Sequence, residues 1–408
     1  MVDATAVEDA LRRVDIERVR ADTPAAGRRI HLNNAGSSLP PAIVTRATIE
    51  YLEAESIDGG YETAAARIDD LDRVYREAAT MFGCDQNELA FQQNASQAWW
   101  AAFNSVPLRP GDRILATSAE YVASGIALVL AAEQGIEVDL IPDDGSGQTS
   151  VEALADMLDE RVKLVCATHV PMSGGLINPI AAIGSVVRQH RARHDGDALY
   201  LVDACQSVGQ LPLDVSEIGA DFVSFTGRKF CRAPRGTGML YQRAGLEGLV
   251  PPRVNDGSGT DWLAPWHIEP TKGARVHELF EYSFAAKVGF GVALGYANEL
   301  GLDNIAARTG ALASVFRGGL ETIEGVDVAD RGVAKSGIVT FSIDGIRPAD
   351  AVRRLADRGI NTSTARPTSA QFDLADRAPD GLVRVSVHYF NTVGELDRVC
   401  DVVTGLTS

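Results

Sequence analysis

Two patterns of hydrophobic and polar positions alternate through the middle of the chain. Short apolar runs rich in β-branched residues, bounded by polar or glycine-containing turns, are typical of buried strands. The stretches between them repeat apolar residues at spacings of three and four, as amphipathic helices do when they cover a sheet. The predicted strands lie at 113–118, 138–142, 163–168, 198–204, 222–227 and 238–242, and the predicted helices at 124–135, 150–160 and 178–194. This alternation predicts an α/β fold with a mainly parallel sheet and helices on both faces.

The pattern changes after about residue 273, where a smaller α+β domain is predicted. Its elements are a long helix at 284–300, strands at 337–344 and 383–387, a helix at 348–358 and a terminal helix. We therefore expect three parts: an N-terminal helical segment (1–30) packed on the small domain, a large domain (31–275) and a small domain (276–408). The proline- and glycine-rich stretch 251–274, with Trp262 and Trp266, is predicted to be irregular, and so long a connection is usually functional or interfacial.

Composition and charge narrow the classes of function. The 408 residues are 45% hydrophobic and 23% charged, with a formal net charge of −17, which is ordinary for an acidic globular protein. Because nucleic-acid binding needs a basic face, this charge argues against such a partner. No stretch approaches the roughly 18 apolar residues that a membrane span needs. The first twenty residues form an amphipathic helical pattern without the apolar core of a signal peptide.

The cysteines indicate a reducing compartment. There are five, at positions 84, 166, 205, 231 and 400, scattered and without a CxxC pair. An odd, dispersed set is neither a disulfide framework nor a zinc site. We expect a cytoplasmic protein without a metal or a membrane partner.

Polar residues follow two predicted strands in a way that suggests chemistry. The strand ALYLV leads into Asp203, and Lys229 follows the strand FVSF twenty-six residues later. In a parallel α/β sheet such strand ends share one crevice, where ligands bind. Ala95 and Ser96, in QNASQAWW, precede a helical pattern, and the free N–H groups at a helix start bind anions.

A lysine, a carboxylate and a phosphate cradle together suggest pyridoxal phosphate (PLP). The lysine would form a Schiff base with the cofactor aldehyde, and the carboxylate would keep the pyridine nitrogen protonated. A lone lysine at a strand end is usually a surface residue, and a lone aspartate there is usually a helix cap. The lysine, the aspartate and the helix start would seldom occur together by chance in this order and at these spacings.

The sequence resembles the class V aminotransferase family of fold-type I PLP enzymes. TGRKFCRAPRGTG, LVDACQSVGQ, SAEYVAS and THVPMSGGLINP carry the resemblance, which runs from about residue 31 to the C-terminus. It implies a large domain with a seven-stranded sheet and a smaller α+β domain. NNAGSS, GGYE and NASQAW bring the chain nearest to the isopenicillin N epimerase-like and C–S lyase-like enzymes. That group includes proteins of ergothioneine and lincosamide biosynthesis.

The resemblance implies roles around the cofactor ring. Lys229 matches the family's Schiff-base lysine, Asp203 the partner of the pyridine nitrogen, and Gln206 the residue that bonds the ring hydroxyl. Cys205 would lie against one face of the ring. Tyr121, in EYVAS, would stack on the other face, where the family usually has a histidine.

It also implies a phosphate site shared between two subunits. Ala95, Ser96, Thr226 and Arg228 match phosphate-binding positions, with Arg228 replacing the histidine of the desulfurases and offering a permanent, bidentate-capable clamp. Ser283, in FEYSFAA, matches a contact supplied by the second subunit. The resemblance thus implies a homodimer with shared active sites.

The implied substrate is an amino acid. Arg384, in GLVRVS, matches the arginine that holds its carboxylate. Asn34, Ala35 and Gly36, in HLNNAGSS, resemble the substrate-side loop, and Tyr61 in GGYE is a further candidate. Of Trp99 and Trp100, at least one is expected in the core.

Two departures from the family bear on the reaction. Desulfurases carry a nucleophilic cysteine on a loop of the small domain, and the corresponding stretch here, 361–381, contains none. Persulfide chemistry is therefore disfavoured. Met172, in THVPMSGG, replaces an asparagine that contacts the ring hydroxyl and makes that wall apolar.

Several outcomes stay open once an amino acid replaces Lys229 on the cofactor. The freed Lys229 is the natural base for the α proton, and desolvation and Arg228 would lower its pKa for this role. We prefer cleavage of the C–S bond of an S-conjugated cysteine by β-elimination in small-molecule biosynthesis, with an aminotransferase as the alternative. Decarboxylative oxidative deamination and epimerisation are further alternatives. A PLP-binding sensor is disfavoured, because the chain has no DNA-binding module.

Overall fold

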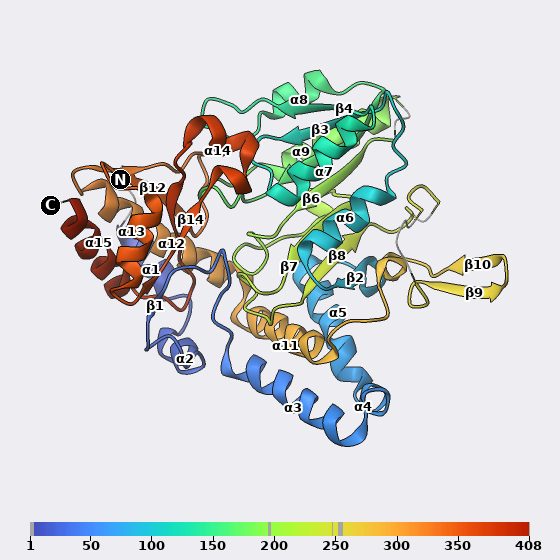
Figure 1. Ribbon diagram of the computed structural model, residues 1–408, viewed down its shortest axis with the longest axis horizontal. Helices are drawn as coiled ribbons and strands as arrows, with labels where there is room; N and C mark the ends of the chain where they lie inside the picture. Colours follow the sequence, from blue (N-terminus) through green and yellow to red (C-terminus); the bar gives the residue numbers. More distant parts are fainter. Residues whose placement is uncertain (1–3, 195–196, 247, 252–255, 408) are drawn as a thin grey trace.

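A seven-stranded sheet forms the centre of the larger of two lobes (Figure 1). The computed structural model describes residues 4–194, 197–246, 248–251 and 256–407. The strand order is β2-β8-β7-β6-β5-β3-β4, and every described pair is parallel except the two that β8 makes. The strands are β2 (Leu89–Gln92), β3 (Arg113–Thr117), β4 (Glu137–Ile141), β5 (Val162–Thr168), β6 (Leu199–Asp203), β7 (Phe222–Thr226) and β8 (Gly238–Gln242). The predicted α/β class and mainly parallel sheet are confirmed.

Helices cover both faces of this sheet because its central strands are apolar on both sides. On one face the side chains of Leu115, Val165 and Val223 pack against four helices, and on the other Ile114 and Leu164 pack against two. The first set is α5 (Ile68–Phe82), α8 (Val151–Met157), α9 (Ile180–His194) and α11 (Phe284–Leu300); the second is α6 (Ala95–Ser105) and α7 (Val122–Glu133). Such two-sided burial is why these strands read as continuous apolar runs.

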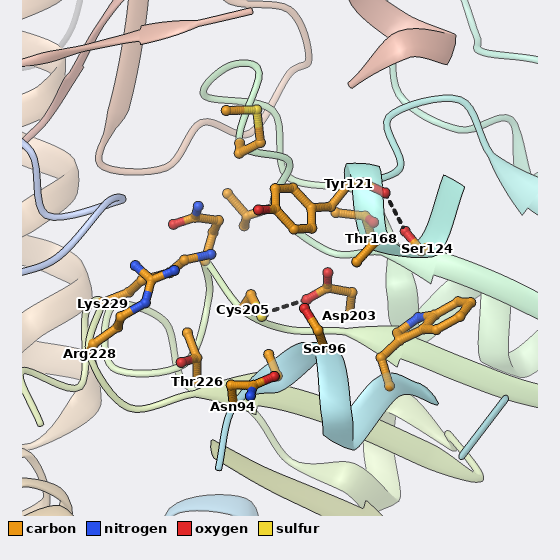
Figure 2. A pocket seen from close by; sticks show the side chains of 16 residues that line it. Asn94, Ser96, Tyr121, Ser124, Thr168, Asp203, Cys205, Thr226, Arg228 and Lys229 are labelled. Atoms are coloured by element: carbon orange, nitrogen blue, oxygen red, sulfur yellow. Dashed lines mark hydrogen bonds between the residues drawn. The ribbon is translucent and has the colours of Figure 1, made fainter. Parts of the chain in front are cut away.

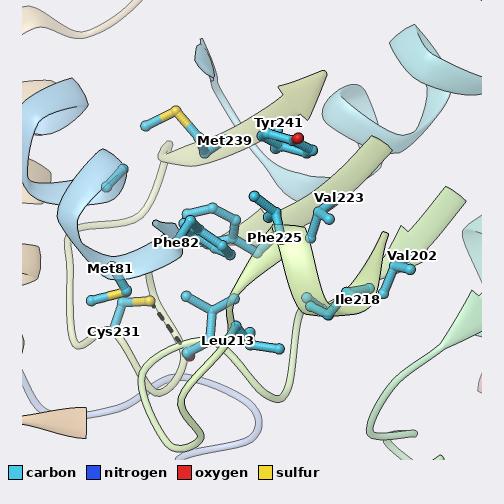
Figure 3. Close-up of a cluster of buried hydrophobic side chains, with 14 of the residues drawn as sticks. Met81, Phe82, Val202, Leu213, Ile218, Val223, Phe225, Cys231, Met239 and Tyr241 are labelled. Carbon is cyan, nitrogen blue, oxygen red and sulfur yellow. Dashed lines mark hydrogen bonds between the residues drawn. The ribbon is translucent and has the colours of Figure 1, made fainter. Parts of the chain in front are cut away.

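On the sheet face that α5 covers, an aromatic cluster joins α5 to the sheet (Figure 3). Phe82, at the end of α5, lies 5.1 Å from the ring of Phe225 on β7. Both side chains are fully buried. Because such pairs contribute beyond their buried area, this contact holds β7 firmly beneath the loop that carries Lys229.

The smaller lobe contains a four-stranded antiparallel sheet in the order β11-β12-β15-β14. Its strands are β11 (Val326–Val328), β12 (Ile338–Ile343), β14 (Ser363–Ala365) and β15 (Leu382–Ser386). Side chains of α12 (Leu302–Glu321), α13 (Pro348–Ala356) and α15 (Val393–Thr407) pack with this sheet in one core. Between β14 and β15 the chain forms η3 (Pro367–Ser369) and α14 (Gln371–Arg377), and α14 contacts α7 of the large lobe.

The N-terminal segment differs from its prediction in one respect. Instead of one helix it forms α1 (Ala4–Leu11) and α2 (Ile16–Ala21), because Asp15 caps a new helix by accepting a hydrogen bond from the Arg18 N–H. α1 packs on α12, and Leu11 lies in the small-lobe core. The domain limits at 30 and 275 stay predictions.

The remaining helices and short strands connect these two cores. α3 (Ala42–Asp58) and α4 (Gly60–Ala66) lie along the lower edge of Figure 1, with α3 packed on α11. β1 (Ile30–His31) pairs with β13 (Ile360–Asn361), and the short helices η1 (Gln86–Glu88), α10 (Val215–Ile218) and η2 (Ala274–His277) complete the set. None of the described helices is long and apolar enough to cross a membrane.

The stretch 251–274 contains regular structure that its composition did not predict. β9 (Thr260–Ala264) and β10 (His267–Pro270) form an antiparallel hairpin that projects from the large lobe (Figure 1). The prediction of an irregular stretch is wrong for these residues, because strand pairing overrides the low propensity of proline and glycine at the ends of the hairpin. Positions 252–255 lie outside the described residues.

Candidate active site

A cavity of about 260 Å³ opens at the carboxyl ends of the parallel strands (Figure 2). Strand ends, the start of α6 and the beginning of α7 all supply side chains to it. The lining residues are Asn94, Ala95, Ser96, Trp99, Tyr121, Ala123, Ser124, Thr168, Val170, Met172, Asp203, Cys205, Gln206, Thr226, Arg228 and Lys229. Nine of the ten residues that the sequence assigned to the cofactor therefore line this one cavity, and the tenth, Ser283, does not.

Asp203 stands at the end of β6 on the cavity floor. One of its carboxylate oxygens accepts a hydrogen bond from the Cys205 N–H at 2.8 Å, while its carbonyl accepts one from the His169 N–H at 2.9 Å. These contacts orient the side chain towards the cavity, as Figure 2 shows. A fixed anion at this depth suits a protonated ring nitrogen.

Lys229 follows β7 and is almost fully buried. Burial lowers the pKa of its amine; the charges of Arg228 and Arg384 lower it further, against the opposing influence of Cys205 and Asp203. The described residues offer it no carboxylate within ion-pair distance, and its Nζ lies 5.9 Å from the centre of the Tyr121 ring. A desolvated lysine of this kind is suited to covalent attachment and to proton transfer.

The start of α6 forms an anion cradle. Asn94 caps this helix by accepting a hydrogen bond from the Gln97 N–H at 2.9 Å. The N–H groups of Ala95 and Ser96 keep no partner among the described residues, and both residues line the cavity. The Arg228 guanidinium adds positive charge beside them. Such a helix start, with its partial positive charge, matches a phosphate group.

These residues fit PLP. Tyr121 would stack on the ring, Asp203 would pair with its nitrogen, and the α6 N-terminus would hold its phosphate. Gln206 supports this placement, because its Nε2 donates to the Ala35 carbonyl at 3.2 Å while its buried Oε1 has no partner. An orphaned buried oxygen is costly unless a ligand group pairs with it.

Arg384 lies on β15 beside the cavity, in unusual isolation for a buried arginine. Its guanidinium donates to the Met172 carbonyl at 3.3 Å and to the Asn33 Oδ1 at 3.4 Å, and its Nε has no partner among the described residues. Burial lowers its pKa to about 10. A buried guanidinium without a carboxylate partner is a ready site for an amino-acid carboxylate.

The loop at 33–38 is held between the lobes. Asn34 donates to the Ser386 carbonyl at 2.7 Å and accepts from the Ser38 hydroxyl at 2.7 Å, so both ends of its amide are engaged. The Ala35 N–H donates to the Ser386 hydroxyl at 2.9 Å, and the Gly36 carbonyl accepts from Arg228. These contacts place the loop against the cavity residues, and direct substrate contacts by it stay predictions.

Two predicted residues lie away from the cavity of their own chain. Tyr61 is 73% exposed on α4, and Ser283 caps α11 by accepting from the Ala286 N–H at 3.1 Å. The resemblance assigned Ser283 to the partner subunit, so its role stays a prediction, as does that of Tyr61. Trp262 and Trp266 are 77% and 100% exposed on the hairpin and do not line the cavity.

Among the residues that the sequence did not assign to the site, Trp99 and Glu120 shape it most. Trp99 lines the cavity while stacking on Phe103 at 4.8 Å, so it belongs to both core and pocket. Glu120 is buried behind Tyr121 and accepts hydrogen bonds from the hydroxyls of Thr117 at 2.7 Å and Ser124 at 2.6 Å. Burial raises its pKa to about 7. The sequence signal for Glu120 was its position in SAEYVAS, directly before Tyr121, the residue predicted to stack on the cofactor ring.

Comparison with known proteins agrees with this geometry. The Aminotransferase class-V family matches residues 30–399. A probable cysteine desulfurase of Methanothermobacter thermautotrophicus is 28% identical over 387 residues, covering 93% of this chain and 95% of that protein. The cysteine desulfurase of Escherichia coli (strain K12 / DH10B) is 29% identical over 423 residues, covering 96% and 97%.

Solved structures show the same fold. An apo cysteine desulfurase from Thermococcus onnurineus NA1 superimposes with a TM-score of 0.87 at 24% identity, covering 96% of this chain and 98% of that one. A cystine C–S lyase in complex with cysteine persulfide gives 0.83 at 22% identity, covering 94% and 99%.

The chain belongs to the class V aminotransferase family. It is a PLP-dependent enzyme with the type I fold, as its sequence predicted. When bound, PLP supplies an electron sink for charge that develops at the substrate α carbon. The residues around it decide which bond breaks.

Proposed function

We propose that the enzyme cleaves the carbon–sulfur bond of an S-substituted cysteine by β-elimination. The α proton and the thiolate leave the amino acid, and addition of water to the remaining fragment gives pyruvate and ammonia beside the free thiol. The observation that carries this proposal is that the cavity wall around Met172 is apolar and offers no cysteine to accept sulfur. Met172 packs against Ala370 and Leu374 of the segment 361–381, which holds no thiol.

Arg384 would bind the substrate, and Lys229 would act as the base. Arg384 would hold the carboxylate through paired hydrogen bonds, which keeps the carbon–carbon bond out of the reacting orientation and disfavours decarboxylation. Lys229 would take the α proton, because burial lowers the pKa of its amine and so favours the neutral form that a base needs. The same proton is then available to the departing sulfur.

The cysteines argue against sulfur transfer to the protein. Several relatives are cysteine desulfurases, yet of the five free cysteines here Cys205 alone lines the cavity. Burial, and then the charge of Asp203, raises its pKa well above the ordinary value, which keeps it as a thiol. A solvated thiolate that could accept sulfur is absent from the cavity lining. Free cysteines are also in keeping with the proposed cytoplasmic location.

We further propose a homodimer. Apolar side chains are exposed on α3, on α4 and on the hairpin, among them Leu52, Tyr61, Trp262 and Trp266. A two-stranded hairpin with exposed tryptophans is marginal by itself and gains stability when covered. Pairing of two copies would bring Ser283 or Tyr61 of one subunit to the site of the other. Sedimentation at several protein concentrations tests this assembly.

The activity test uses PLP-loaded enzyme, S-substituted cysteines and no keto acid. Thiol and pyruvate in equal amounts are the expected products. Carbon dioxide with an aldehyde would replace the proposal by decarboxylative oxidative deamination. A reaction that stops after one equivalent and resumes with added keto acid would replace it by an aminotransferase. Recovery of the mirror-image amino acid would indicate an epimerase.

A further inference from the structure

An apolar groove lies between α7 and α14, beside the cofactor cavity. Its volume is about 290 Å³. It is lined by Glu120, Tyr121, Val122, Gly125, Ile126, Val129, Leu130, Thr368, Gln371 and Phe372. The side chains of Ile126, Val129 and Leu130 are 53%, 50% and 42% exposed, although soluble proteins usually cover a run of this kind.

Tyr121 separates the groove from the cavity and lines both. It occupies the N-cap position of α7, so its ring hangs over the cavity mouth at 5.9 Å from the Lys229 Nζ. The ring remains 38% exposed. A substituent that extends from the reacting end of a substrate therefore meets the groove as soon as it passes the edge of this ring.

The opposite wall of the groove is held in place by ion pairs. Asp373 on α14 pairs with Arg331 at 2.9 Å and with Arg377 at 3.0 Å. Arg331 also pairs with Asp143 of the large lobe at 3.1 Å, which fastens α14 across the two lobes. The neighbouring Phe372 is thereby fixed over α7.

Small residues keep the groove open. A β-carbon built on Gly125 would lie 3.6 Å from the Phe372 ring, so a larger residue at this position would fill the space between the helices. Thr368 and Gln371 are the polar side chains on the α14 side. The groove is thus formed before any ligand arrives, and it borders the cavity at Tyr121.

We propose that this groove binds the apolar sulfur-linked group of a cysteine conjugate whose amino-acid end reacts at Lys229. This inference rests on the proposed function and names its substrate class: S-alkyl or S-aryl cysteines with an extended apolar substituent. The shared border with the cavity at Tyr121 favours this occupant. The exposed faces suited to a second copy, on α3, α4 and the hairpin, lie elsewhere on the molecule (Figure 1).

The test uses a series of S-alkyl cysteines from methyl to octyl with PLP-loaded enzyme. Each methylene buried in the groove should raise kcat/KM by up to roughly fourfold until the groove is full. Val129→Ser should lower the octyl-to-methyl ratio of kcat/KM by roughly four- to tenfold. Val333→Ser, at another exposed valine outside the groove, should leave the ratio as in the native enzyme.

Binding measurements keep this test separate from the proposed reaction. Calorimetry of the same amino acids with Lys229→Ala protein reports affinity without turnover. If no conjugate releases thiol but affinity still rises with chain length and falls in Val129→Ser, the proposed reaction fails and the groove assignment stands. Affinity and kcat/KM that ignore chain length would overturn the groove assignment, and so would a Val129→Ser protein that changes its oligomeric state.

Discussion

Two sets of cations in this enzyme, one buried and one half-buried, differ in what neutralises them. Around the cavity, Lys229 and Arg384 have no carboxylate within ion-pair distance among the described residues. Around α14, Arg331 and Arg377 converge on Asp373, whose side chain is 2% exposed. Both regions lie at the junction of the two lobes, yet one is left unpaired and the other is neutralised within the chain.

The difference separates cations that stabilise the fold around α14 from cations at the cavity that a bound anion could neutralise. A buried cation without a partner lowers stability, so a fold retains it where bound molecules supply the missing anion. The ion pairs of Asp373 with Arg331 and Arg377 neutralise these charges within the chain, and they hold α14 in place. Substitutions should therefore separate the two sets: changes at the cavity should cost function, and changes at α14 should cost stability.

Replacement of Lys229 by alanine should have the largest effect. Without the amine, covalent attachment of PLP is lost, and turnover should fall by at least roughly 10³-fold because the general base is also removed. Borohydride reduction followed by mass spectrometry checks attachment, and thiol release checks turnover. Lys335→Ala, at an exposed lysine, is the control. A Lys229→Ala enzyme with native turnover would remove the cofactor assignment.

Arg384→Ala should mainly weaken substrate binding. Loss of a desolvated charge pair with the substrate carboxylate should cost ~2–5 kcal/mol, seen as a raised KM. Arg384→Lys should recover part of this, since lysine keeps the charge but not the paired geometry. The free energy of unfolding of the unliganded protein should not fall, as no internal ion pair is broken. An unchanged KM would take Arg384 out of the site.

Asp373→Ala should show the opposite behaviour. It leaves two arginines without their shared carboxylate, and the free energy of unfolding should fall by roughly 2–3 kcal/mol. That is less than a fully buried pair costs, because Arg331 and Arg377 are 30% and 22% exposed and can turn to water. Denaturant unfolding measures the loss, with exposed Asp376→Ala on the same helix as control. Equal stability of the two variants would contradict the role of the network.

Glu120→Gln should have the smallest effect, visible in pH dependence. Burial raises the pKa of Glu120 to about 7, so the native state favours the protonated acid. Its contribution to stability is full below the unfolded pKa near 4.5 and is lost as the pH rises towards 7. The glutamine variant should therefore gain roughly 2 °C in Tm at pH 8 relative to native enzyme, and little at pH 4.5. Glu133→Gln, at an exposed glutamate at the end of α7, should show no such pH-dependent gain.

Much of the large lobe could be predicted because its signals are local. All six strands foreseen between 113 and 243 are present, since strands buried on both faces must be apolar throughout. β2 was not foreseen, because its four residues give too short a pattern. The single N-terminal helix was wrong, as the cap at Asp15 competes with continuation of the helix.

The site was foreseen in its cofactor half and less so in its substrate half. Asp203 and Lys229 follow strands of one sheet, so their meeting follows from topology. The partners of Arg384 come from residues 33 and 172, and Phe372 meets Gly125 across the lobes. No local pattern reports contacts between segments so far apart along the chain.

The sequence alone determined the sheet, the PLP-dependent class of the enzyme and the absence of a thiol from the segment 361–381, because periodicity and residue chemistry are properties of the chain itself. Only the tertiary structure decided that Arg384 is buried without an anion, that burial raises the pKa of Glu120 to about 7, and that α7 and α14 enclose an apolar groove. Those features depend on desolvation and on which surfaces meet, and both arise when distant segments pack together.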